Sequence, residues 1–345
     1  MAKSGHKQWF LSAQQSAMLL LAIAFCNTVI SAQQTNSFNH AVSLFKKGSY
    51  AEAAEALAAI VKDDSTSVAA HLYLGKTLIN LQRFSEAETA LRRYTAARPA
   101  SDEGLYLLAY VLFREGRAKE SLTIYTQAVK LKPPTSDDLK IVGLNYGLLN
   151  NLERSADYLK RALDADPNNL EALYYLGRVR YTENHFGEAT RIFQEILKRD
   201  SQHIKALNNL GQALEAQNNL EEATAAYRRA IELDRNSAKP SELPLLNLGL
   251  LLLQNNQIEE AIALLTRAAE ANPRSAQVKF HLGKAYMRLE RLSDAERELV
   301  AATQLAPQDV GAHYQLGRLY YRLKKTDLAR REMEISEQLR TKGRH

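Results

Sequence analysis

Hydrophobic residues recur along the chain at the three- and four-residue spacing of amphipathic helices, and short polar stretches interrupt them. Residues 208–227, NNLGQALEAQNNLEEATAAY, show this pattern on both sides of the polar triplet at 217–219. The spacing predicts two short helices joined by a turn at the triplet. Gly211 is unexpected in the first of these helices. Glycine inside a helix is about 1 kcal/mol less favourable for helix formation than alanine.

The same helical hairpin returns every 34 residues, with a glycine in the same place. These glycines are Gly75, Gly143, Gly177, Gly211, Gly249, Gly283 and Gly317. Nine repeats fit when four extra residues, 238–241, are placed before the seventh. The repeats comprise residues 34–67, 68–101, 102–135, 136–169, 170–203, 204–237, 242–275, 276–309 and 310–343.

Helix packing explains a glycine at position 8 of each repeat. Position 20 is always alanine or serine, and position 24 is large, as in Phe193 and Tyr227. The position-20 alanines include Ala87, Ala189, Ala223, Ala261, Ala295 and Ala329. Small residues at positions 8 and 20 allow the two helices of a hairpin to approach closely, and the burial gained offsets the lost helix propensity. In six repeats position 15 is glycine or asparagine, the residues that accept the left-handed conformation ending a helix.

The period, the two-helix unit and the small, large and proline positions resemble the tetratricopeptide repeat family over residues 34–343. The resemblance implies an all-α fold, a right-handed α-solenoid of nine helix-turn-helix 34-residue repeats. It also implies that the first helices line the concave side of a superhelix. Family members that catalyse reactions do so in an additional domain, and residues 34–343 leave no segment for one. We therefore expect a protein that is not an enzyme.

Composition and motifs agree with a function in binding rather than catalysis. The chain has 345 residues, a net charge of +6 and one cysteine, Cys26, which excludes an intramolecular disulfide. No HExxH, GxGxxG, Walker-type or GxSxG string occurs, and the eight histidines show no helical i,i+4 pairing. We expect no cofactor and no metal site.

The first 32 residues have the layout of a secretory signal peptide. Lys3 and Lys7 precede an apolar stretch that is densest over residues 18–26, and the segment ends in VISA. Cleavage is expected after Ala32, which places the mature protein in the periplasm or outside the cell. The alternative is an uncleaved membrane anchor, although polar residues interrupt the apolar stretch.

The face of the first helices opposite their packed side carries ten basic and four acidic residues. The basic residues are Lys46, Lys76, Arg114, Lys140, Arg178, Lys205, Lys284, Arg288, Arg318 and Arg322. The acidic residues are Glu103, Asp137, Glu171 and Glu215. Many aromatic residues lie on the same face. We expect partner binding at Lys76, Tyr106, Arg114, Tyr174, Arg178, Tyr181, Phe280, Lys284, Arg288, Tyr314, Arg318, Tyr321 and Arg322.

The seventh repeat is apolar on this face as well. Leu243, Leu246, Leu250 and Leu253 stand where polar residues are expected. One interpretation is that the insertion at 238–241 folds back and covers them. The other is an exposed apolar anchor for an amphipathic partner helix or for a second copy of the protein.

These features predict a protein–protein interaction scaffold of the bacterial cell envelope that binds acidic or amphipathic partner segments in a basic, aromatic-lined groove. A reader of carbohydrate or cell-wall polymer and a membrane-anchored assembly factor are the alternatives. Nucleic acid is not an expected partner, because the export signal and the glycine–alanine repeat pattern disfavour an RNA-binding solenoid.

Overall fold

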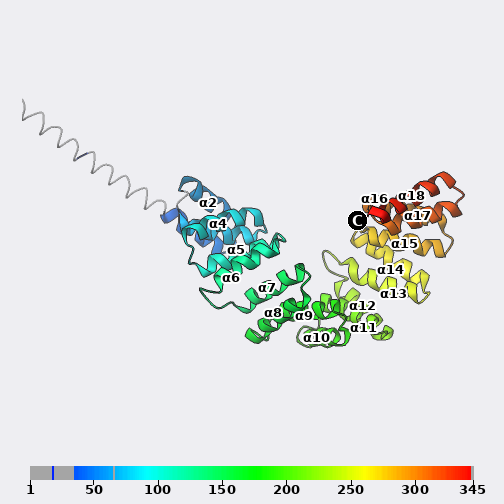
Figure 1. Ribbon diagram of the computed structural model, residues 1–345, viewed down its shortest axis with the longest axis horizontal. Helices are drawn as coiled ribbons and strands as arrows, with labels where there is room; N and C mark the ends of the chain where they lie inside the picture. Colours follow the sequence, from blue (N-terminus) through cyan, green and yellow to red (C-terminus); the bar gives the residue numbers. More distant parts are fainter. Residues whose placement is uncertain (1–17, 19–34, 65–66, 343–345) are drawn as a thin grey trace, which may run out of the picture. The chain divides into compact units, whose positions relative to one another are not determined.

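The computed structural model describes residues 18, 35–64 and 67–342 (Figure 1). The predicted signal peptide, apart from Met18, lies outside these residues. Residues 35–46 are helical, and the helices α2 to α18 follow in chain order without a strand in the described ranges. None of the described helices is long and apolar enough to cross a membrane.

The helices alternate between the first and the second helix of a repeat. The first helices are α3 (Val68–Asn80), α5 (Asp102–Arg114), α7 (Ser136–Leu148), α9 (Leu170–Thr182), α11 (Ile204–Ala216), α13 (Glu242–Gln254), α15 (Ala276–Arg288) and α17 (Val310–Arg322). The second helices are α2 (Tyr50–Asp63), α4 (Phe84–Ala97), α6 (Ala118–Ala128), α8 (Leu152–Ala165), α10 (Phe186–Arg199), α12 (Leu220–Asp234), α14 (Ile258–Ala271), α16 (Leu292–Leu305) and α18 (Thr326–Lys342). Each of these first helices begins at the first residue of a repeat defined from the sequence.

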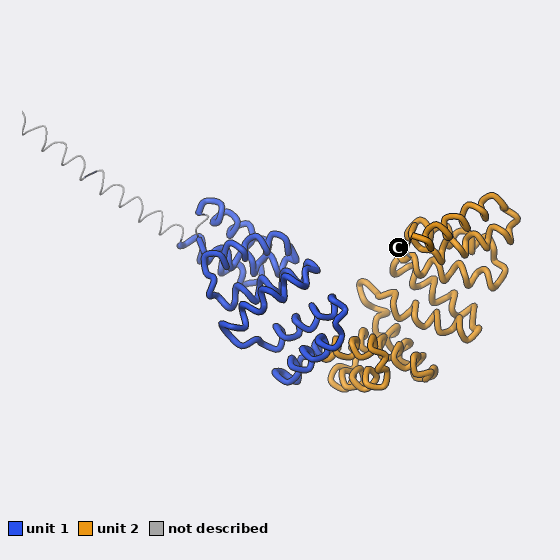
Figure 2. The backbone as a smooth tube through the Cα atoms, in the orientation of Figure 1, with its two compact units in different colours: residues 1–172 blue, residues 173–345 orange. Residues whose placement is uncertain are grey.

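The chain forms two compact units, residues 1–172 and residues 173–345, which Figure 2 shows in blue and orange. In unit 1 each helix from α2 to α8 packs on the next one, and α5 also contacts the first helices α3 and α7. In unit 2 each helix from α10 to α18 packs on the next one, and α13 contacts α11 and α15. This succession of packed helix pairs is the all-α solenoid that the repeats predict.

The turn inside each hairpin ends its first helix through a left-handed residue at position 15. The predicted residues at this position have positive φ, with values of 80° at Gly48, 76° at Gly116 and 62° at Asn218. The prediction is confirmed. Glutamine, glutamate and lysine adopt the same conformation in the remaining repeats, at Gln82, Glu290 and Lys324.

Close contact between the two helices accounts for the glycines at position 8. A Cβ atom added to Gly211 would lie 2.5 Å from a ring carbon of Tyr227, which is completely buried. The other six glycines of the series face the large residue at position 24 in the same way, at 2.5 to 3.0 Å. The alanines at position 20, such as Ala189 and Ala223, are also completely buried. Both observations confirm the packing prediction.

The insertion before the seventh repeat is held in place by a buried carboxylate. Asp234, at the end of α12, accepts hydrogen bonds from the hydroxyl of Ser237 and from the backbone N–H of Ser241. Residues 238–240 between these serines are exposed. The insertion therefore forms a turn with its own hydrogen bonds and does not act as an apolar cover.

The four leucines of the seventh repeat do not form an exposed anchor, which corrects one of the two expectations. Leu246 is 2% exposed and belongs to the core of unit 2, while Leu250 and Leu253 pack against that core. Only Leu243 remains open to solvent, at 49%. The reason is that α13 lies against the neighbouring first helices α11 and α15, so its second apolar side is shared with them.

Candidate functional site

Unit 2 contains a cavity of 770 Å³ that crosses the first helices α9, α11 and α13, and we call it the α9–α13 groove. Five residues predicted to bind a partner line it, namely Tyr174, Arg178, Tyr181, Leu243 and Leu246. The three residues on α9 and the two on α13 are 62 to 72 positions apart along the chain, and the groove brings them together across α11. The structure therefore brings this part of the predicted site together.

A row of polar side chains runs across the groove from one helix to the next. Asn247 of α13 donates a hydrogen bond to the amide oxygen of Asn208 on α11 (2.9 Å). The neighbouring Asn209 donates to the hydroxyl of Tyr174 on α9 (3.0 Å). Asn208 is buried, and a buried polar group normally requires a hydrogen-bond partner. Asn247 supplies that partner for the amide oxygen of Asn208.

The row ends at α9 in a hydroxyl group that can still donate. The Tyr174 oxygen accepts the bond from Asn209, and a phenol retains one proton for a further acceptor. Burial raises the pKa of Tyr174, which keeps the hydroxyl protonated at neutral pH. Its ring is fixed by stacking on His203, with 5.6 Å between the ring centroids.

Two exposed cations stand beside this polar row. Arg178 on α9 lies over the ring of Tyr175 (6.0 Å), and Lys205 occupies the start of α11. Within the described residues neither has an acidic side chain at ion-pair distance, and the amide of Gln212 has no hydrogen-bond partner there. The groove therefore presents donors and positive charge to a ligand.

The α13 end of the groove is apolar. Leu243 is exposed there, and Pro244 and Leu246 line the cavity beside it. A ligand that crosses the groove thus meets a polar, positively charged part on α9 and α11 and an apolar part at the start of α13, around Leu243. This division suits a peptide segment, which carries both backbone amides and side chains of different character.

The predicted cluster on α15 and α17 separates into two kinds of residue. Arg288 donates to the carbonyl oxygen of Leu253 at the end of α13 (2.7 Å), and Arg322 donates to that of Met287 at the end of α15 (3.1 Å). Each arginine adds a side-chain donor to a carbonyl at the end of the preceding first helix, which also accepts a backbone N–H from the following turn. These two residues hold neighbouring repeats together, which differs from the expected role in gripping a ligand.

The other residues of that cluster remain available at the surface. Lys284 lies over the ring of Phe280 (5.3 Å), and Arg318 lies over the ring of Tyr314 (5.9 Å). Tyr314 is 47% exposed and Tyr321 is 53% exposed. Lys284 and Arg318 have no ion-pair partner among the residues that the structure describes.

In unit 1 the predicted basic residues are mostly engaged within the protein. Lys76 forms an ion pair with Glu103 (2.5 Å). Lys140 is buried and bridges Asp137 and Glu171, at 2.7 Å from each. These pairs explain why an excess of basic residues in the sequence does not become an equal excess of free positive charge.

Two other predicted residues of unit 1 have partners of their own. Arg114 donates to the hydroxyl of Tyr110 (2.7 Å) and covers the ring of Phe84 (4.3 Å). Tyr106 donates to the carbonyl oxygen of Lys132 (2.7 Å), and burial raises its pKa to about 12.

Sequence reasoning missed most of the polar row. Asn208 and Gln212 lie on the predicted binding face, but Asn209 and Asn247 sit one position beside it. The signal available was the recurrence of asparagine at position 6 in the sixth and seventh repeats. Within the described part of the chain, no group of three or more His, Cys, Asp and Glu residues is placed to hold a metal ion.

The packed hairpins and the groove along the first helices define a helical-repeat binding protein. Models of the tetratricopeptide repeat match residues 44–110, 102–135, 143–202, 204–237, 246–309 and 282–335. The chain belongs to the tetratricopeptide repeat family. This membership supports protein–protein interaction as its general role.

Solved structures share the fold at low sequence identity. Yeast Tom70 is 20% identical with a TM-score of 0.60, over 82% of this chain and 60% of that one. The Cut9–Hcn1 hetero-tetramer of the APC/C is 17% identical with a TM-score of 0.56, over 88% of this chain and 60% of that one. The chain thus spans 60% of the length of each structure. No curated protein sequence matches it.

Proposed function

We propose that the protein is a non-enzymatic scaffold of the bacterial cell envelope that binds a segment of a partner protein in the α9–α13 groove. The observation that carries the proposal is the row of Tyr174, Asn209, Asn208 and Asn247 between free cations and an apolar end. An extended peptide has backbone amides that need hydrogen-bond partners, and side-chain amides and hydroxyls supply them.

The charges in the groove specify the partner further. Arg178 and Lys205 favour a segment with an acidic residue on the α9 and α11 side, because opposite charges at an interface add attraction and speed association. The exposed side chain of Leu243 favours an apolar side chain of the partner on the α13 side. The proposed ligand is therefore an acidic and amphipathic segment.

Placement in the envelope rests on the predicted signal peptide. The basic start, the apolar stretch and the small residues before Gln33 are the features that signal peptidases recognise. We expect N-terminal sequencing of the purified protein to begin at Gln33 or within a few residues of it. Recovery of intact Met1 in a membrane fraction would contradict cleavage and support an anchored protein.

Site-specific photo-crosslinking tests the groove itself. A photoreactive amino acid at Gln212, inside the groove, should give protein adducts in the producing cell, and the same residue at exposed Gln194 on α10 serves as the control. Arg178→Glu combined with Lys205→Glu should lower partner affinity at least about tenfold, a loss of about 1.4 kcal/mol. The yield of adducts from the wild-type groove should also fall as the salt concentration rises, because salt screens the attraction between partner and groove.

Two outcomes would contradict this function. Identical adducts from positions 212 and 194 would mean that the groove has no special role. If the molecule crosslinked at position 212 is itself resistant to protease, the carbohydrate or cell-wall polymer alternative is favoured.

A further inference from the structure

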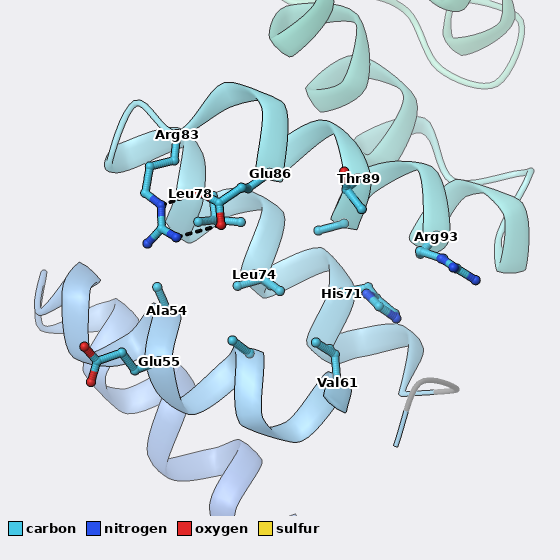
Figure 3. A pocket seen from close by; sticks show the side chains of 12 residues that line it. Ala54, Glu55, Val61, His71, Leu74, Leu78, Arg83, Glu86, Thr89 and Arg93 are labelled. Carbon is cyan, nitrogen blue, oxygen red and sulfur yellow. Dashed lines mark hydrogen bonds and ion pairs between the residues drawn. The ribbon is translucent and has the colours of Figure 1, made fainter. Parts of the chain in front are cut away.

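Unit 1 contains an open apolar cleft on the side of its second helices. It has a volume of 460 Å³ and lies between α2 and α4, above α3 (Figure 3). We propose that this cleft binds one amphipathic helix of a partner protein. The proposal concerns α2 and α4, so it is independent of the α9–α13 groove, which is lined largely by first helices of unit 2.

The amino-acid sequence explains why the cleft is open. Helix α2 reads YAEAAEALAAIVKD and turns the small residues Ala54 and Ala58 toward the cleft. Ala58 stands at position 25 of its repeat, where other repeats carry longer side chains such as Arg92, Lys160 or Gln194. Alanine leaves the space that these side chains would cover.

The floor and walls of the cleft are apolar. Leu74 and Leu78 of α3 form its floor (Figure 3), and Val61 and Ala90 also line it. A cavity of about 150 Å³ accommodates one benzene molecule, so 460 Å³ has room for two or three aliphatic side chains. Exposed apolar surface of this kind, bounded by polar residues, is typical of an interaction site.

The shape of the cleft fits a helix. The lining residues of α2 run from Ala54 to Val61, which is about 10 Å along a helix axis. A partner helix covers that length with two turns, and its residues at i, i+3 or i+4, and i+7 then point to one side. Side chains on one helix pack in the groove between two others by the same rule that governs helix packing in general.

Charges at the two ends of the cleft give the partner helix a direction. Glu55 lies at one end and Arg93 at the other, as Figure 3 shows. Neither has an ion-pair partner within the described ranges, whereas Arg83 and Glu86 at the rim neutralise each other (2.6 Å). A helix with acidic residues in its first turn and basic residues in its last turn satisfies both ends when its first turn lies at Arg93. Acidic residues in the first turn and basic residues in the last turn also interact favourably with the dipole of the partner helix.

A designed peptide tests the proposal on the full chain. It is an amphipathic helical peptide with leucines at i, i+4 and i+7, glutamates in the first turn and lysines in the last turn. Fluorescence anisotropy should show saturable binding to the wild-type protein. Ala58→Phe fills the cleft and should weaken binding at least tenfold, while Ala59→Phe on the exposed surface of the same helix should leave it unchanged.

Further variants separate the proposal from its alternatives. Circular dichroism should show the same helix content for both phenylalanine variants. Glu55→Lys with Arg93→Glu should weaken binding of the peptide at low salt, and the groove variant Arg178→Glu with Lys205→Glu should not affect it. The proposal fails if the peptide does not bind at millimolar concentration, or if Ala58→Phe and Ala59→Phe behave alike. It also fails if the wild-type chain self-associates and Ala58→Phe alone abolishes this, because the occupant is then a second copy.

Discussion

Replacing Gly211 by leucine is expected to lower the free energy of unfolding by about 2 kcal/mol. Even the first added carbon atom would lie 2.5 Å from the ring of Tyr227, which is completely buried and cannot move without opening the core of unit 2. Overpacking of this kind costs about 1–3 kcal/mol and sometimes more, and the gain in helix propensity returns only about 1 kcal/mol. Urea unfolding followed by circular dichroism measures the difference.

Gly187 provides the matched control for this experiment. It lies in α10, is exposed, and the atom nearest to an added Cβ is the Gln217 Oε1 at 3.7 Å. Gly187→Leu should therefore leave stability unchanged or raise it slightly through helix propensity. Gly211→Ala should have a smaller effect than Gly211→Leu, since the third repeat pairs Ala109 with Tyr125 at the same two positions. Equal stability of Gly211→Leu and wild type would refute the close-packing explanation.

Stability should also fall in mild acid because of His281 on α15. Burial of the imidazole, reinforced by the positive charge of Lys284, lowers its pKa from 6.5 to about 4, while Asp309 acts in the opposite direction. The folded protein thus favours the neutral ring, and the unfolded chain takes up a proton first as the pH falls. The resulting stabilisation is complete above about pH 6.5 and is lost progressively toward pH 4.

His281→Gln isolates this contribution. Allowing for partial exposure of the ring, we expect the wild type to lose about 2 kcal/mol more than the variant between pH 7 and pH 4. His185→Gln is the control, because the His185 side chain is 60% exposed in a turn. Thermal unfolding over a pH series gives the slopes. If wild type and His281→Gln lose stability in parallel, the buried imidazole is not responsible.

The hairpins could be predicted from the sequence because their determinants are local. Apolar spacing defines each helix, and the residue at position 15 ends the first helix of a hairpin through its own backbone conformation, as at Gly116 and Asn218. The glycines required one further step, the comparison of repeats. Their agreement at position 8 indicated a close contact before the partner residue, such as Tyr227 for Gly211, was known.

The candidate site was predicted less well because it depends on contacts between repeats. Arg288 looks like a surface charge in the sequence, yet its guanidinium is bound to a carbonyl oxygen of the preceding first helix. Leu246 looks like an exposed apolar residue, yet α11 and α15 flank its helix. The cleft beside Ala58 exists because alanine leaves space that a longer side chain would fill. The spacing of hydrophobic residues does not reveal such a space.

The arginines at the ends of α15 and α17 have a consequence for how unit 2 comes apart. Each arginine is supplied by one repeat and caps the first helix of the repeat before it, as Arg322 does for α15. Loss of the last repeat would remove its arginine and leave the carbonyl groups at the end of α15 without that partner. Fraying that starts at the C-terminal end would then weaken the next boundary in turn. Unfolding of this unit is therefore expected to proceed from the C-terminal end toward the N-terminal end. The arginine contacts couple the stability of each repeat to that of the repeat after it.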